Sequence, residues 1–253
     1  MKFSLSKNSK FYKEFYRINL PIFVSQLFLV TIGILNSLIF GQLGEKIISS
    51  IAITDKLNSI YWPLISAIAT VMTIYFIQYK GVGNEEGIKT VFIFSNILMM
   101  GVAVIAFIFI NILGRKMIAL YTKDIQVISD AYFYLWFIGF SNIVATGTYS
   151  LITYFNGVGR VKESSIIAII QALINFLLYY LFVIKIDFIG GIKGIALAIT
   201  ITKTLEFIFY YRIYKKKFSL KKIDFSYEKL RTLKGITKKV FPLIFNNLIF
   251  MIA

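Results

Sequence analysis

The 253-residue sequence contains no cysteine and no histidine, and it has only three prolines and two tryptophans. The absence of cysteine excludes disulfides and thiolate metal sites, and the absence of histidine excludes imidazole acid–base chemistry. Acidic residues are also scarce, because 12 Asp and Glu stand against 28 Lys and Arg, for a formal net charge of +16. Since no clustered carboxylates accompany a nucleophile, we do not expect an enzyme.

Apolar residues dominate what is present. Hydrophobic side chains make up 58% of the chain, and the mean hydropathy is +0.75, whereas soluble domains are typically about 45–50% apolar. Residues 1–17 are polar and basic, and the apolar run that follows is too long for a signal peptide and lacks its cleavage site. We therefore expect an all-α, polytopic membrane protein whose first helix is retained as an anchor.

Six segments are long and apolar enough to span a bilayer, for which about 20 residues are needed. They cover residues 18–40, 47–78, 91–113, 129–155, 165–184 and 191–214. A seventh begins near Val240. The expected organisation is a cytoplasmic N-terminus, a six-helix lobe, a basic linker and the start of a second lobe, at residues 1–17, 18–214, 215–239 and 240–253.

Basic residues cluster beside the apolar segments. Five precede the first segment, and eleven lie between Arg212 and Lys239. Because cytoplasmic loops are enriched in Lys and Arg, this bias predicts that both clusters lie on the cytoplasmic side, where the linker rests on the membrane. We expect the lipid bilayer, and no nucleic acid, as the partner of these charges. The abundance of Lys, Ile, Asn and Phe suggests an AT-rich bacterial genome. We therefore expect the protein in the cytoplasmic membrane of a bacterium.

A short sequence near the start returns near the end. Residues 20–27 read LPIFVSQL, and residues 241–248 read FPLIFNNL. Each copy has a proline at the start of an apolar helix and two polar side chains one turn later. Secondary transporters are built from such repeats, with a central site between two lobes. The pattern predicts a complete six-helix repeat and the beginning of a second lobe of the same protein.

Glycine and proline mark the expected turns and bends. Glycine pairs at 41–44, 81–83 and 157–159 predict tight turns, because glycine adopts backbone conformations that other residues avoid. A phosphate-binding loop is disfavoured, since no strand precedes these glycines and no GxxxxGK[ST] motif is present. Pro63 removes one backbone hydrogen bond within the second segment, so we expect a bend there.

Ionisable side chains inside a membrane are costly and by default mark a functional path. Asp55 and Lys56 lie in the second predicted span, with Asp55 about 12 Å from the start of its helix. Lys203 and Glu206 lie three residues apart in the sixth, on one helical face. The alternatives are a local structural role near the interface for the first pair, and a structural ion pair for the second. If functional, Glu206 faces a cavity and attracts a cation.

Neutral polar residues also occur within the spans. Four lie on the fourth segment and one on the fifth: Asn142, Thr146, Thr148, Ser150 and Asn175. They line a water-filled cavity or form interhelical hydrogen bonds, which are worth about 0.6–2 kcal/mol each in membranes. The sequence leaves both interpretations open.

Several strings resemble one transporter family in their order and spacing. They are LPI and SQL within 20–27, GQLGE at 41–45, QY at 78–79 before Gly81, LYTKD at 120–124, and GIKG at 191–194 followed by Ala196, Ala198, Lys203 and Glu206. Over essentially its full length, the chain resembles the N-terminal half of a multidrug and toxic compound extrusion (MATE) transporter. The resemblance implies a twelve-helix, two-lobe exporter of small organic cations, driven by Na⁺ or H⁺ and without another cofactor.

The sequence departs from this family at the cation site that the resemblance implies. The family's acidic residue on the first helix corresponds to Asn36, and its two fifth-helix residues correspond to Asn175 and Tyr179. Its sixth-helix threonine corresponds to Ile199, so only Asn175 retains the family's residue. Sodium requires several hard oxygen ligands, and a proton carrier requires a titratable carboxyl. We hypothesise that Asp55 has taken over the acidic role.

Two other functions are compatible with this sequence. A flippase for lipid-linked saccharide precursors would have the same fold, but it would favour an Arg- and Lys-lined cavity to hold pyrophosphate. A degenerate lobe that does not transport is the second alternative, and the lost cation ligands support it. The carboxylates of Asp55 and Glu206 favour a cationic substrate.

Overall fold

The computed structural model describes residues 9–186, 190–217, 238–246 and 249. Within these ranges the chain forms helices joined by short turns, and no strand occurs. In chain order the elements are α1 (Ser9–Gly41), α2 (Glu45–Asn58), α3 (Tyr61–Gly81), α4 (Glu85–Ala119), α5 (Ile125–Gly157), α6 (Val161–Tyr179), the π-helix η1 (Tyr180–Lys185) and α7 (Ile192–Lys217). The predicted all-α fold is confirmed.

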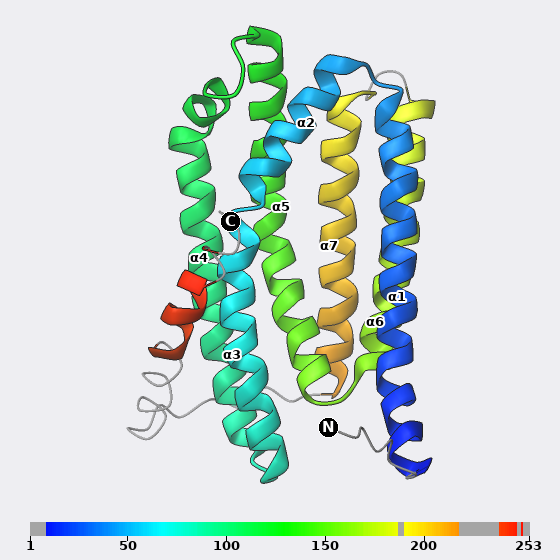
Figure 1. Ribbon diagram of the computed structural model, residues 1–253, viewed down its shortest axis with the longest axis vertical. Helices are drawn as coiled ribbons and strands as arrows, with labels where there is room; N and C mark the ends of the chain where they lie inside the picture. Colours follow the sequence, from blue (N-terminus) through cyan, green and yellow to red (C-terminus); the bar gives the residue numbers. More distant parts are fainter. Residues whose placement is uncertain (1–8, 187–189, 218–237, 247–248, 250–253) are drawn as a thin grey trace, which may run out of the picture.

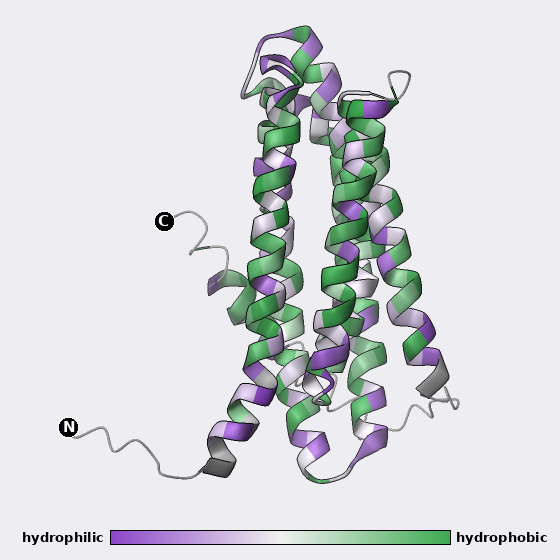
Figure 2. Ribbon diagram, turned by 90° about the vertical axis from the view of Figure 1, so that its right-hand side faces the viewer, coloured by the Kyte–Doolittle hydropathy of each residue, from purple (hydrophilic) through white to green (hydrophobic). Residues whose placement is uncertain are grey.

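The long helices run side by side along one axis (Figure 1). Among the described residues, five segments are long and apolar enough to cross a membrane: Phe15–Gly41, Glu45–Gly81, Glu85–Ala119, Ile125–Gly157 and Val161–Lys185. Figure 2 shows hydrophobic residues along the middle of these helices and more hydrophilic residues toward the two ends. The chain is a multi-pass membrane protein.

The sixth predicted segment forms α7, which is not among those five. It carries Lys203 and Glu206 near its middle, and it packs against α5 and α6. In Figure 1, α7 lies within the bundle between α5 and the α1–α6 side. Neighbouring helices therefore cover the polar face of α7.

One end of the bundle holds the start of α1, the α3–α4 turn and the α5–α6 turn, and we call it the basic end. It is the lower end in Figure 1. The opposite end holds the α1–α2 and α4–α5 turns. Gly44, Gly83 and Gly159 have φ values of +89°, +69° and +80°, a conformation that favours glycine. The predicted tight turns are confirmed.

The predicted second segment is divided into α2 and α3. The backbone N–H of Ser59 donates to the carbonyl of Asp55 at 2.8 Å and closes α2. Pro63, the third residue of α3, has no backbone N–H, so it cannot continue the helical hydrogen bonds from α2 into α3. In Figure 1, α2 runs obliquely to α3. The expected bend is present, as a break between two helices.

Helix α5 lies at the centre of one group of helices. It packs against α2, α3, α4 and α7, whereas α1 packs mainly against α6. The largest apolar cluster fills the space between α3, α4, α5 and α7, and its fully buried members include Ile65, Met72, Phe76, Met99, Phe155 and Tyr210. Helices α1 and α6 thus form a second unit that joins the rest largely through α7.

Residues 238–246 are helical, at the position where the sequence predicts a seventh helix. Val240 belongs to the largest apolar cluster, and Leu243 and Ile244 pack against it. The Lys239 ammonium lies 4.8 Å from the centre of the Tyr75 ring. The start of the predicted second repeat therefore packs on α3. Most of the predicted linker, at 218–237, lies outside the described residues.

Candidate functional site

Three helices meet at a chain of polar side chains near the opposite end of the bundle. The Asn36 side-chain N–H on α1 donates to Asn175 Oδ1 on α6 at 3.3 Å. The Asn175 N–H in turn donates to Thr202 Oγ1 on α7, also at 3.3 Å. Thr202 donates to the Ala198 carbonyl at 2.7 Å. We call Asn36, Asn175 and Thr202 the amide cluster, and it links α1 and α6 to α7.

The amide cluster ends in an unused acceptor. Among the described residues, the buried Oδ1 atom of Asn36 has no hydrogen-bond partner. A buried polar atom without a partner carries a desolvation cost, and in a native structure such an atom calls for an explanation. The Asn36 oxygen can accept a bond from a proton donor or contribute one ligand to a small cation.

Tyr179 lies one turn beyond Asn175, on the same face of the helix. The α-helix changes to a π-helix directly after Tyr179, where η1 begins. Short π-helical segments are rare and frequently occur at functional sites. Tyr179 itself is buried beside Phe40 of α1, with ring centres 5.1 Å apart. The predicted residues Asn36, Asn175 and Tyr179 therefore come together.

Asp55 lies near the end of α2. Asp55 is exposed in the described lobe. Neither Asp55 nor Lys56 has a salt bridge to a described residue within 4.0 Å. Among the described residues, no hydrogen bond joins Asp55 to the amide cluster.

A column of polar residues continues from the amide cluster along α7. Thr202, Glu206 and Tyr210 are spaced one turn apart, and their exposed fractions are 1%, 5% and 0%. The Tyr210 hydroxyl donates to the Ser164 carbonyl at 2.9 Å, near the start of α6. At 1.5 Å per residue, the three α7 residues extend over about 12 Å. Helix α7 is therefore bonded to α6 at two levels, through Thr202 to Asn175 and through Tyr210 to Ser164.

Glu206 and Lys203 form the expected ion pair. Their nearest charged atoms, Lys203 Nζ and Glu206 Oε2, are 3.0 Å apart. The Glu206 side chain is 6% exposed and that of Lys203 is 29% exposed. The carboxylate is therefore a buried charge within a predicted span, neutralised by a lysine that is partly accessible.

The sequence did not identify Thr202. The resemblance placed the relevant sixth-helix position at Ile199, yet the hydroxyl that reaches Asn175 belongs to Thr202. The four-residue spacing of Thr202, Glu206 and Tyr210 was an available signal, because such residues share one helical face. Within the described residues, no three acidic side chains gather in a way that could hold a metal ion.

A second set of polar residues joins α5 to α2 and α3, and we call it the α5 seam. Its interhelical bonds use Ser50, Thr54, Asn58, Tyr61, Asn142 and Thr146. The Asn142 side chain donates to Asn58 Oδ1 at 2.6 Å, and the Thr54 hydroxyl contacts the Ala131 carbonyl at 3.1 Å. Ser150 also pairs across helices, with Asn96 at 3.1 Å. Three of the four predicted polar residues on this helix, all but Thr148, therefore form interhelical bonds.

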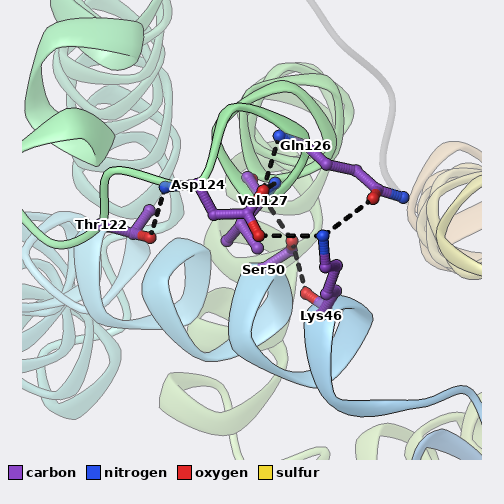
Figure 3. A network of polar contacts seen from close by, with 6 residues as sticks. All are labelled: Lys46, Ser50, Thr122, Asp124, Gln126 and Val127. Carbon is purple, nitrogen blue, oxygen red and sulfur yellow. Dashed lines mark hydrogen bonds and ion pairs between the residues drawn. The ribbon is translucent and has the colours of Figure 1, made fainter.

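At the opposite end, an exposed network continues the α5 seam (Figure 3). Lys46 Nζ lies 2.9 Å from Asp124 Oδ2 and donates to Gln126 Oε1 at 3.2 Å. Asp124 also caps α5 by accepting from the backbone N–H groups of Gln126 and Val127. The hydrogen bond from Lys46 and these backbone bonds hold the pKa of the Asp124 carboxyl below its ordinary value. This network fixes the start of α2 to the start of α5.

At the basic end, a cavity of about 420 Å³ lies between α1, α3 and the start of α6. Basic side chains dominate its lining, which consists of Arg17, Lys80, Gly159, Arg160, Val161, Lys162 and Glu163. We call it the basic cavity. None of the predicted transport residues belongs to it.

Sequence and structure comparisons identify similar proteins. The sequence profile of the MatE family matches residues 21–181, from α1 into η1. A comparison with curated proteins finds no match. The profile covers four of the six predicted candidates, Asn36, Asp55, Asn175 and Tyr179.

Solved structures share the fold. One is described as the outward-facing conformation of a multidrug resistance MATE family transporter of the MOP superfamily, with 16% identity and a TM-score of 0.81. A MOP superfamily transporter from Pyrococcus furiosus has 15% identity and a TM-score of 0.81, and a MATE protein in the bent conformation has 16% and 0.78. Each match covers 92% of this chain and 52% of the other. The chain thus spans about half the length of these structures, as expected for an N-terminal half.

Proposed function

The chain belongs to the MatE family of membrane transporters, and on this basis we propose that it forms one lobe of an antiporter that exports small organic cations. The coupling ion is Na⁺ or H⁺. Transport proceeds by alternating access, in which two lobes rock around a central site. The protein resides in the cytoplasmic membrane of a bacterium, with the basic end and the linker 215–239 at the cytoplasmic face.

The amide cluster is the observation that carries this proposal. It holds polar side chains between three helices in the apolar part of the bundle, and one buried acceptor, Asn36 Oδ1, is unused. Two carboxylates are candidates for the acidic role, Asp55 on α2 and Glu206 one turn beyond Thr202 on α7. A cation that binds here interacts with α1, α6 and α7 at once. Binding can therefore bias the position of the α1–α6 unit.

Similar structures support a conformational cycle. One is described as outward-facing and another as bent. In this chain, α1 and α6 pack mainly on each other and meet the remaining helices largely through α7. This division offers two units that can shift relative to one another. The candidates Asn36, Asn175 and Tyr179 all lie on the α1–α6 unit, and the bond from Asn175 to Thr202 joins this unit to α7.

The experiment uses the complete protein in proteoliposomes with an imposed proton or sodium gradient, and it follows export of a fluorescent organic cation. We expect Asp55→Asn or Glu206→Gln to abolish gradient-driven export while the protein remains folded. Asp124→Asn is the matched control, because Asp124 is an acidic residue outside the spanning segments. Gradient-driven export that persists in both Asp55→Asn and Glu206→Gln would contradict the proposed coupling.

A flippase is the second candidate, and the basic cavity favours it. Arg and Lys side chains at a membrane face suit a pyrophosphate-linked cargo better than a cation. One similar structure, the Pyrococcus furiosus transporter, is described as having a binding pocket whose reverse polarity suggests a different function. Transfer of a lipid-linked pyrophosphate across the bilayer, with no export of cations, would select this candidate. Absence of both activities would select a lobe that does not transport.

A further inference from the structure

The basic cavity brings together charges from three separate elements. Arg17 comes from α1, Lys80 from the end of α3, and Arg160 and Lys162 from the junction of α5 and α6. Glu163 is the single acidic residue among the described residues of the lining, and its carboxylate lies 3.7 Å from Arg160. The described residues of the lining thus carry four positive charges and one negative charge, a net charge of +3. Such a cavity attracts an anion.

Backbone geometry holds one of these charges in place. The Lys80 ammonium donates to the Val158 carbonyl at 2.6 Å. The adjacent Gly159 has a φ of +80°, and a Cβ at that position would lie 2.8 Å from Lys80 Nζ. A Cβ at this position would displace the ammonium slightly, and the positive φ itself favours glycine. Because an ammonium group has three donors, the bond to Val158 leaves two for a ligand.

The first turn of α6 adds further donors to the same cavity. The first N–H groups of a helix lack partners within the helix, and at α6 the N-cap residue, Arg160, makes no side-chain capping bond to them. Val161, Lys162 and Glu163 supply both the lining and this first turn. The helix dipole favours an anion at this position, in addition to the four basic side chains.

The depth of the cavity indicates the source of the anion. Arg17 lies two residues after Phe15, where the first spanning segment begins, and Lys80 lies one residue before Gly81, where the second ends. Another spanning segment begins at Val161, within the lining. The cavity therefore lies at the boundary between the apolar band and water, which is the level of phospholipid headgroups.

We propose that the basic cavity binds the phosphate of an anionic phospholipid headgroup in the leaflet at the basic end. Basic pockets between transmembrane helices are suited to such headgroups. The bound lipid ties α1, α3 and α6 together and neutralises the charge at this face, which otherwise repels a cationic substrate. The site shares no residue with the amide cluster, Asp55 or Glu206, so it does not depend on the proposed transport mechanism.

The test measures lipid binding to the complete purified protein by native mass spectrometry. Phosphatidylglycerol is compared with phosphatidylcholine of the same acyl chains, and inorganic phosphate is added in a separate arm. The test variant is Arg17→Gln with Lys162→Gln. The matched control is Arg115→Gln with Lys116→Gln, which removes one Arg and one Lys that are exposed near the opposite end.

We expect wild-type protein to prefer phosphatidylglycerol. The test variant should weaken this binding about 30-fold, as expected for the loss of two basic charges near an anionic headgroup, and the control should leave it unchanged. Lys162→Gln alone, at an exposed position, should weaken it about fivefold. Equal affinity for the two lipids, or equal losses in the test and control variants, would overturn the proposal. Displacement of the lipid by inorganic phosphate alone would assign the site to a soluble anion and overturn the lipid assignment.

Discussion

The α5 seam and the amide cluster both place polar side chains inside an apolar bundle, but they differ in how fully those side chains are paired. In the α5 seam, Asn142 donates to Asn58 at 2.6 Å, and the Thr54 hydroxyl meets a backbone carbonyl at 3.1 Å. In the amide cluster, both interhelical bonds are 3.3 Å long, and Asn36 Oδ1 has no partner among the described residues. The α5 seam is closed, whereas the amide cluster has capacity for a further ligand.

This difference separates a scaffold from a responsive region. Buried polar groups with complete hydrogen bonding rigidify the helices that carry them. An incompletely paired group remains only where the surrounding structure compensates, and such positions concentrate at functional sites. We infer that α2, α3, α4, α5 and α7 form the scaffold and that α1 and α6 form the unit that responds to a cation.

The largest expected effect comes from Glu206→Leu, which removes one half of the buried ion pair. Lys203 is left without its partner, at a cost of about 2–3 kcal/mol, less than for a fully buried pair because the lysine is 29% exposed. Replacing both residues, as Lys203→Met with Glu206→Leu, should restore stability to within about 1 kcal/mol. Thermal unfolding in detergent checks both values. A double variant no more stable than the single variant would contradict the pairing.

Gly157→Ala tests how tightly the scaffold is packed. A Cβ at Gly157 would lie 2.9 Å from Phe76 Cβ on α3, so the two helices must separate, at a cost of about 1–3 kcal/mol. Gly101→Ala on α4 is the control, since no atom lies within 4 Å of its Cβ and alanine favours a helix. Chemical or thermal unfolding should show a lower unfolding free energy than wild type for Gly157→Ala and a higher one for Gly101→Ala. Equal stabilities would show that α3 and α5 are less closely packed than the structure describes.

Alanine substitutions at two asparagines compare the α5 seam with the amide cluster directly. Asn142→Ala leaves Asn58 without its 2.6 Å donor and should cost about 1–2 kcal/mol. Asn36→Ala removes a 3.3 Å bond and an unpaired acceptor together, so its cost should be only about 0.5 kcal/mol. Transport should respond in the reverse order, with Asn36→Ala the more impaired. A larger stability loss for Asn36→Ala would refute the assignment of scaffold and responsive unit.

The smallest effect is expected at the Lys46–Asp124 network shown in Figure 3. Because the pKa of Asp124 is lowered in the folded protein, its ionised form stabilises the fold above the unfolded pKa of about 3.9. That contribution is lost as the pH falls through the folded pKa. Asp124→Asn should therefore lower the melting temperature slightly at pH 7 in low salt. The difference from wild type should vanish at 1 M salt, where surface charges are screened; a difference that salt does not change would exclude an electrostatic origin.

The sequence predicted most of the fold because the physical signals are strong and local. Long apolar runs gave the spanning helices, and Gly44, Gly83 and Gly159 gave the turns through their backbone freedom. Pro63 indicated the division of α2 from α3. Lys203 and Glu206 were predicted to pair from their spacing alone.

The composition of the site was only partly predictable. Asn36 and Asn175 lie 139 residues apart in sequence, and their meeting with Thr202 depends on how three helices pack. Hydropathy does not specify which face of α7 turns toward α6. The basic cavity likewise combines residues from elements that are distant in sequence. The sequence shows that these residues are charged, but it does not show that they lie close together.

We infer that α1 and α6 move relative to the scaffold when the coupling ion binds. This chain contains no cysteine, so spin labels can be introduced at chosen cysteines once any cysteine elsewhere in the complete protein has been replaced. The labelled positions are Ser37 on α1, Ile48 on α2 and Ile112 on α4, all exposed near the opposite end. Double electron–electron resonance then reports the distances from position 112 to positions 37 and 48 in the complete protein, as pH or Na⁺ is varied.

We predict that the distance from 37 to 112 shifts by about 2 Å or more, a typical helix displacement in such transitions, while the distance from 48 to 112 stays constant. The shift should disappear when Asn36 is replaced by Ala. Equal shifts in both distances, or no shift in either, would contradict the division of this lobe into a scaffold and a responsive unit.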